Sequence, residues 1–278
     1  MTLVQARVIV VGNEKGGAGK STIAIHLATG LVSAGRSVAV IDLDVRQQSL
    51  GRFLANRRSW SAANQASLAM PHEFGLGDDI VQLAAAHSDQ ALERFSSAFE
   101  AAREKAEFVI IDTPGGDTSL SRRAHGAADQ IVTPMNDSFL DFDLLGHVDP
   151  NSLELLRPSI YSETVWESRK QKAAKEGRSI DWVVLNNRLA VTEARNRRRL
   201  DDRVQALSRR VGFRIGPGLR DRVIYRELFP FGLTVADLSP TIRPVSVSLA
   251  HVAARAELRL LMSALGLVDP DTDVATAA

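Results

Sequence analysis

The sequence predicts an α/β protein with a doubly wound, mostly parallel sheet and helices on both faces. Short runs rich in Val and Ile alternate with longer segments of helical periodicity. The runs are apolar almost throughout, as expected for strands covered by helices on both sides. We expect strands at Arg7–Gly12, Ser37–Leu43, Glu107–Asp112, Asp129–Met135 and Asp181–Asn186, with helices between them such as Lys20–Ser33 and Ala91–Lys105.

The chain of 278 residues is expected to form one domain over residues 1–266. Two stretches interrupt the alternation of strands and helices. Residues 58–89 are expected to form a loop with a short helix, and residues 149–178 an insertion within the same domain. Residues 267–278 are small and acidic, which predicts a flexible tail.

Composition excludes several classes of protein. The chain has no Cys, which excludes disulfides, thiolate metal sites, iron–sulfur clusters and cysteine nucleophiles. The N-terminus lacks the features of a signal peptide and no apolar run reaches 18 residues, so a cytoplasmic protein is expected. The net charge is only +1, but Arg188–Arg226 holds 12 Arg against 4 acidic residues. This asymmetry indicates a polyanion as a candidate partner.

A glycine-rich loop, KGGAGKST at Lys15–Thr22, follows the first strand and begins a helix. Such a loop directs consecutive backbone N–H groups at phosphate oxygens, and the helix N-terminus adds positive potential. Lys20 is expected to reach the β- and γ-phosphates, Ser21 to ligate Mg²⁺ and Thr22 to bond the α-phosphate. The predicted phosphate-binding residues are Gly16, Gly17, Ala18, Gly19, Lys20, Ser21 and Thr22.

This loop, with VAVIDLD at Val38–Asp44 and FVIIDTPGG at Phe108–Gly116, resembles the ParA/MinD family of deviant Walker ATPases. Within that family the chain is most similar to the MipZ group of bacterial division-site regulators. The resemblance extends from Arg7 to about Gly266. It implies a P-loop NTPase fold, ATP and Mg²⁺ as cofactors, and ATP hydrolysis.

The resemblance also implies roles for charged residues around the loop. Lys15 would reach the partner's phosphates across a nucleotide-sandwich dimer and act as a catalytic cation together with Lys20. Asp42 and Asp112 would hold the Mg²⁺ shell, and Asp44 would orient the attacking water. Because side chains two apart in a strand share one face, Asp42 and Asp44 are expected to point into the same crevice.

Adenine contacts are assigned by the same resemblance. Asn187 and Arg188 follow the fifth predicted strand and match the base-binding corner of the family, and Pro217 matches a second base-contacting loop. Ordinary turn chemistry remains an alternative for all three residues.

A predicted helix carries Leu200, Val204, Leu207 and Val211 on one apolar stripe, with arginines over most of the remaining surface. Few aromatic residues are interleaved, so contact with the phosphate backbone without sequence reading is expected. A solvated face paired with acidic neighbours is the alternative. The candidate DNA-binding residues are Arg195, Arg198, Arg199, Arg203, Arg209, Arg220 and Arg222.

The resemblance implies a homodimer with ATP, nonspecific DNA, and the proteins FtsZ and ParB as partners, with the protein near the nucleoid and the cell poles. Two other readings stay open: a ParA-type chromosome-segregation ATPase, and a ligase-type metabolic enzyme with the same loop. A membrane-binding MinD type is disfavoured, because the tail DPDTDVATAA cannot form a basic amphipathic helix.

Overall fold

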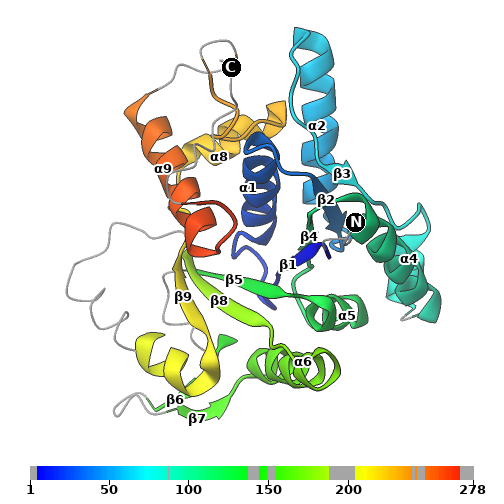
Figure 1. Ribbon diagram of the computed structural model, residues 1–278, viewed down its shortest axis with the longest axis vertical. Coiled ribbons are helices and arrows are strands. Elements are labelled where there is room, and N and C mark those ends of the chain that lie inside the picture. The colour runs from blue at the N-terminus through cyan, green and yellow to red at the C-terminus, as the bar shows by residue number, and fades with distance from the viewer. Residues whose placement is uncertain are drawn as a thin grey trace.

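The computed structural model describes residues 5–86, 88–136, 144–149, 155–187, 204–239, 242 and 248–269. In this part of the chain, seven strands form one sheet in the order β3-β2-β4-β1-β5-β8-β9, and every neighbouring pair is parallel (Figure 1). The predicted fold class is confirmed. The strands are β1 (Arg7–Val11), β2 (Val38–Asp42), β3 (His72–Glu73), β4 (Phe108–Asp112), β5 (Gln130–Asn136), β8 (Asp181–Asn187) and β9 (Arg214–Pro217), and a separate antiparallel hairpin joins β6 (Gly146–Val148) to β7 (Leu155–Pro158).

Helices cover both faces of the sheet because alternate strand residues point in opposite directions. Ile9 and Val11 of β1 pack in one core with α1, α2, α8 and α9, whereas Val8 and Val10 pack in a second core with α3, α4, α5 and α6. The helices are α1 (Lys20–Ser33), α2 (Ser49–Asn64), α3 (Ile80–Ala85), α4 (Asp89–Lys105), α5 (Ser119–Ala127), α6 (Ile160–Glu176), α8 (Val223–Leu228) and α9 (Leu249–Ala264), with a π-helical turn η2 (Ser208–Gly212) and a 3₁₀ turn η3 (Phe229–Phe231).

Three expectations about the chain's organisation differ from the structure. The stretch 58–89 is more ordered than expected, because α2 continues to Asn64 and β3 extends the sheet beside β2. Within 149–178, α6 connects the adjacent parallel strands β5 and β8 and buries Val165, so this helix is a crossover of the main fold and not an insertion. The flexible tail was expected from residue 267, but Leu267 is buried in the core and Val268 packs against that core.

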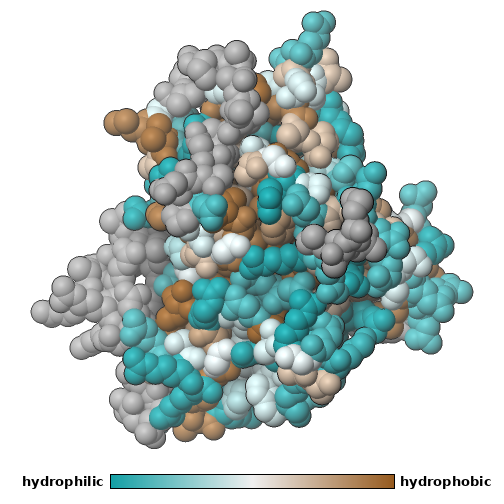
Figure 2. All heavy atoms as spheres, viewed as in Figure 1, coloured by the Kyte–Doolittle hydropathy of each residue, from teal (hydrophilic) through white to brown (hydrophobic). Residues whose placement is uncertain are grey.

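The face of the molecule in Figure 2 is mostly hydrophilic, with apolar atoms gathered at the amino end of α9, where Leu249 and Val252 are exposed. Among the described residues, no helix combines the length and the apolar character needed to cross a membrane.

Helix α1, which follows the glycine-rich loop, is buried along almost its whole length and contains a buried histidine. His26 Nδ1 lies 2.8 Å from the carbonyl oxygen of Thr22, and its ring meets Tyr225 edge-on at 4.8 Å between centroids. Burial lowers the pKa of His26 from 6.5 to about 4. The folded protein therefore holds this ring in its neutral form near neutral pH.

We predict that His26 contributes to acid destabilisation. The pKa of His26 is lower in the folded chain than in the unfolded chain. Its protonation therefore does not reduce the free energy of unfolding above pH 6.5, and reduces it progressively as the pH falls toward 4. The loss from this residue is about 3 kcal/mol. The His26→Gln variant has no such titration. Urea unfolding at pH 7, 6, 5 and 4 should show the free energy of unfolding of the wild type falling faster than that of the variant; parallel curves would contradict the assignment.

Candidate functional site

The carboxyl ends of β1, β2 and β4 meet at one edge of the sheet. Their register pairs Val11 with Asp112 and Asp42 with Asp112. The glycine-rich loop leaves the sheet directly after Val11, so the loop and both predicted metal-binding carboxylates lie at this edge. This is the position where open α/β sheets bind ligands.

The loop between β1 and α1 has the backbone conformation that its glycines predict. Gly17 and Gly19 adopt φ values of 75° and 91°, in the left-handed region, and Gly19 caps the N-terminus of α1. Asn13 braces the loop, because its Nδ2 donates to the Pro134 carbonyl at 2.6 Å and its Oδ1 accepts from the Lys15 N–H at 2.7 Å. The loop thereby presents a helix N-terminus and adjacent amides suited to an anion.

Lys20 is held inside this loop. Its side chain is buried and its Nζ donates to the carbonyl oxygen of Lys15 at 2.9 Å. Burial lowers the pKa of Lys20, while the nearby Asp112 and Asp44 carboxylates favour its charged form. Lys15 is partly exposed at the rim of the loop. The loop therefore holds one buried lysine side chain and carries a second, partly exposed lysine five residues earlier.

Asp112 is completely buried, and among the described residues neither of its carboxylate oxygens has a hydrogen-bond partner of ordinary geometry. Burial and the neighbouring Asp42 raise its pKa well above the ordinary value, and Ser21 and Lys20 oppose this shift. A buried carboxylate without partners is costly unless a cation neutralises it. Ser21 and Asp112 therefore fit Mg²⁺, which usually keeps several waters and few protein ligands.

Asp42 has a second task that sequence reasoning missed. Its Oδ1 accepts from the N–H of Asp44 at 3.0 Å, and its Oδ2 accepts from the N–H groups of Leu50 and Gly51 at 3.0 and 3.2 Å. Burial still raises the pKa of Asp42 to about 6. The carboxylate thus fixes the turn that carries Asp44 and caps the first turn of α2.

The segment Thr113–Gly116 joins β4 to α5 and contacts the phosphate loop. Thr113 Oγ1 donates to the Val11 carbonyl at 3.0 Å. Gly115 lies so close to the loop that a Cβ there would be 3.3 Å from the Gly16 nitrogen. This segment is therefore positioned to respond to a group bound in the loop.

A cavity of about 260 Å³ lies beside Thr22 and is suited to a nucleotide base. Asn187 braces it: its Nδ2 donates to the Ala18 carbonyl at 2.8 Å and its Oδ1 accepts from the Leu219 N–H at 3.1 Å. Pro217 instead pairs with Asn186 at the end of β9 and lies outside the cavity lining. The lining consists of Thr22, Asn187, Leu219, Arg220, Asp221, Arg222, Tyr225, Arg226 and Phe229.

Sequence reasoning missed Leu219 and Tyr225 in this cavity. They are more than 30 positions from Asn187 in the chain, and no local pattern connects them. Tyr225 comes from α8 and Leu219 from the segment after β9, so only tertiary packing brings them to Thr22.

The arginine cluster is only partly within the described residues. Val204 and Leu207 are buried, as the apolar stripe predicts, and Arg209 is exposed on η2. Arg220 and Arg222 both pair with Glu257 of α9, at 3.5 and 2.6 Å, and Arg222 is only 20% exposed. Four candidate DNA-binding residues and one candidate adenine contact lie outside the described residues: Arg195, Arg198, Arg199, Arg203 and Arg188.

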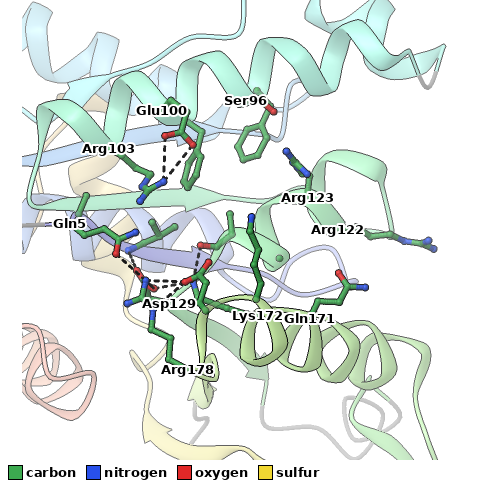
Figure 3. Close-up of a pocket in the computed structure, with 18 residues that line it drawn as sticks. Gln5, Ser96, Glu100, Arg103, Arg122, Arg123, Asp129, Gln171, Lys172 and Arg178 are labelled. Carbon is green, nitrogen blue, oxygen red and sulfur yellow. Dashed lines mark hydrogen bonds and ion pairs between the residues drawn. The ribbon is translucent and has the colours of Figure 1, made fainter.

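A second cavity, of about 330 Å³, lies at the amino ends of the strands between α4, α5 and α6 (Figure 3). Its carboxylates are paired with neighbouring cations: Asp129 lies 2.9 Å from Lys172 and 3.3 Å from Arg178. Arg122 points away from the cavity in Figure 3 and pairs with Asp117. None of the predicted nucleotide-binding residues lines this cavity.

Comparisons with known proteins identify the family of the chain. The family model for ATPase MipZ matches residues 7–269. The chromosome partitioning protein ParA of Caulobacter vibrioides is 29% identical over 55% of this chain and 64% of its own length, and the septum site-determining protein MinD of Helicobacter pylori is 29% identical over 53% and 60%. The chain thus spans less than two thirds of these curated relatives.

Solved structures share the fold. The McdA–ATP complex of Cyanothece superposes with a TM-score of 0.58 at 19% identity, covering 95% of this chain and 98% of that one. The cell division ATPase MinD of Pyrococcus furiosus gives a TM-score of 0.55 at 16% identity, covering 95% and 100%.

The parallel sheet, the glycine-rich loop and the buried Asp112 beside Lys20 define a P-loop protein with the fold of the ParA/MinD ATPases. Because the family model covers nearly the whole chain, the protein belongs to the MipZ family of ATPases.

We predict that Asn187→Ala weakens nucleotide binding about tenfold, because it removes two hydrogen bonds that join the phosphate loop to the base cavity. ATP and ADP should be affected equally, since the γ-phosphate lies away from this side chain. Calorimetric titration with each nucleotide measures the effect. Asn64→Ala is the control, because Asn64 Nδ2 donates to the Trp60 carbonyl within α2 and neither residue lines the cavity; an equal loss there would contradict the prediction.

Proposed function

We propose that this protein is an ATP-dependent dimerisation switch that regulates cell division by inhibiting FtsZ assembly away from midcell. The observation that carries the proposal is the second cation of the phosphate loop, Lys15, in a chain of the MipZ family. The ATP-bound dimer binds DNA nonspecifically, and slow hydrolysis of ATP returns it to monomers.

ATP and Mg²⁺ are the cofactors in this proposal. The amides of Gly16–Gly19 and the Lys20 ammonium bind the phosphates, while Ser21 and Asp112 hold the metal shell with Asp42 nearby. Mg²⁺ held by these residues would supply positive charge that offsets the charge developing on the phosphates. Asp44 is partly exposed beside Lys20, which suits it to orient a water molecule.

In this proposal the Lys15 side chain serves the nucleotide site of the second subunit. Its backbone carbonyl already accepts from Lys20, and its side chain begins at the exposed rim of the loop. A lysine there is placed to reach the phosphates of a second subunit that packs against the same edge. Charge supplied in trans stabilises the transition state as an arginine finger does.

We assign DNA binding to the arginine cluster, and among its described members Arg209 is the candidate contact. Arg209 is exposed, and no ion pair involves it among the described residues. Dimerisation would place two such surfaces on one particle, which strengthens binding to a polyanion. ParB is the proposed partner near the chromosome origin, and this assignment rests on family membership alone.

A ParA-type chromosome-segregation ATPase is the second candidate function. The similarity to the ParA protein of Caulobacter vibrioides favours it, and the phosphate loop serves both functions equally. The two differ in their effect on FtsZ, which decides the test below.

We predict that Arg209 and Arg222 differ in DNA binding. Arg209→Ala removes an exposed cation, so it should weaken binding of the ATP state and reduce the salt slope by about 1. Arg222→Ala should leave the slope nearly unchanged, because its charge is already paired with Glu257. Fluorescence anisotropy over 50–200 mM salt, with a nonhydrolysable ATP analogue, measures both. Equal salt slopes for the two variants would contradict the prediction that Arg209 contacts DNA and Arg222 does not.

We further predict that adding the protein lowers the amount of FtsZ polymer recovered by sedimentation, and that this decrease occurs only when ATP is present. Lys15→Ala should bind ATP, remain monomeric by light scattering and leave FtsZ polymer unchanged, because the cation shared across the dimer is missing. A dimeric wild type that does not affect FtsZ would favour the ParA-type function. A Lys15→Ala variant that dimerises like the wild type would contradict the role of Lys15.

A further inference from the structure

The first residue of the phosphate loop is held by a tyrosine from a distant helix. Tyr161, at the start of α6, is buried, and its hydroxyl donates to the Gly12 carbonyl at 2.8 Å. Gly12 follows β1 directly and opens the loop. In the described part of the chain, this hydroxyl is the partner of that carbonyl. A residue 149 positions away thus fixes the peptide at which the loop leaves the sheet.

This bond belongs to a chain of buried side chains. Trp182 Nε1 lies 3.0 Å from Thr133 Oγ1, and Thr133 Oγ1 lies 2.8 Å from the Tyr161 hydroxyl. A carbonyl oxygen only accepts, so the Tyr161 hydroxyl donates its single hydrogen to Gly12. Thr133 accepts from the Trp182 indole N–H and donates its own hydroxyl hydrogen to the Tyr161 oxygen. Each bond polarises the next in this buried surrounding.

The His125 ring of α5 packs edge-on against Tyr161, at 5.7 Å between ring centroids. Its Nδ1 lies 2.6 Å from the Ser121 carbonyl, so Nδ1 carries the proton and Nε2 is unprotonated. Nε2 lies 3.4 Å from the Tyr161 hydroxyl and fills the space where a Cβ on Gly12 would stand, at 2.6 Å. Helix α5 begins directly after the segment Thr113–Thr118 that contacts the phosphate loop.

We propose that Tyr161 is a positioning residue for the phosphate loop: its hydroxyl sets the Gly12 carbonyl, and His125 joins this contact to α5 behind the Thr113–Gly116 segment. The inference rests on the proposed ATP-binding function and adds a residue that touches neither nucleotide nor metal. The contact also explains why position 12 is a glycine, because any side chain there would displace His125.

Tyr161→Phe removes only the hydroxyl and leaves the Gly12 carbonyl buried without its donor. The peptide then rotates toward other partners, and nucleotide binding must restore it. We expect the Kd for ADP and the KM for ATP to rise about tenfold, with kcat changed less than twofold. Thr133→Val, which removes the donor to Tyr161, should raise the Kd two- to threefold.

Ser162→Ala is the matched control. Ser162 is the next residue of α6, is equally buried, and donates to the Leu145 carbonyl at 2.7 Å, away from the loop. Both variants should lower the unfolding midpoint, but only Tyr161→Phe should weaken ADP binding, measured with a fluorescent ADP well below that midpoint.

The inference is overturned if Tyr161→Phe binds ADP like the wild type, or if Ser162→Ala weakens binding equally. If Tyr161→Phe does not fold, an unchanged Kd in Thr133→Val overturns it. A wild type that binds no nucleotide would instead contradict the proposed function itself.

Discussion

The parallel pairing of β4 with both β1 and β2 is the constraint on which the site depends. It places Val11, Asp42 and Asp112 at one level of the sheet, so the phosphate loop starts beside two carboxylates. Asp112 is buried there with no hydrogen bond of ordinary geometry among the described residues, and the charged Lys20 side chain lies nearby. The chemistry of the site follows from this register, because a shift of one residue would turn Asp112 to the other face.

Hydrogen bonds between the loop and segments outside it then hold the loop in shape. Asn13 bonds to Pro134, Asn187 to Ala18 and Tyr161 to Gly12, so three segments after β4 each fix a different point of the loop. All three bonds end on backbone carbonyls, so none of the three uses an amide N–H of the loop. A loop braced in this way loses less conformational entropy when a nucleotide binds.

Several elements follow from local sequence patterns and others do not. The five Val- and Ile-rich runs and the helix after the loop are found within a residue or two of their predicted bounds. The short strands β3 and β9 were not predicted, because two to four residues with few apolar side chains carry no periodic signal. The segment that forms α6 was expected to be an insertion because it is rich in charged residues. Those residues cover its exposed face, and only its buried face packs against the sheet.

The sequence by itself determined the fold class and the phosphate loop, since glycine spacing and strand periodicity act over a few residues and need no tertiary context. Only the tertiary structure decided which residues brace the loop and line the base cavity. Tyr161, Leu219 and Tyr225 come from segments far apart in the chain. Their contacts arise because the crossovers of a parallel sheet return distant segments to the same edge, and no local pattern records that return.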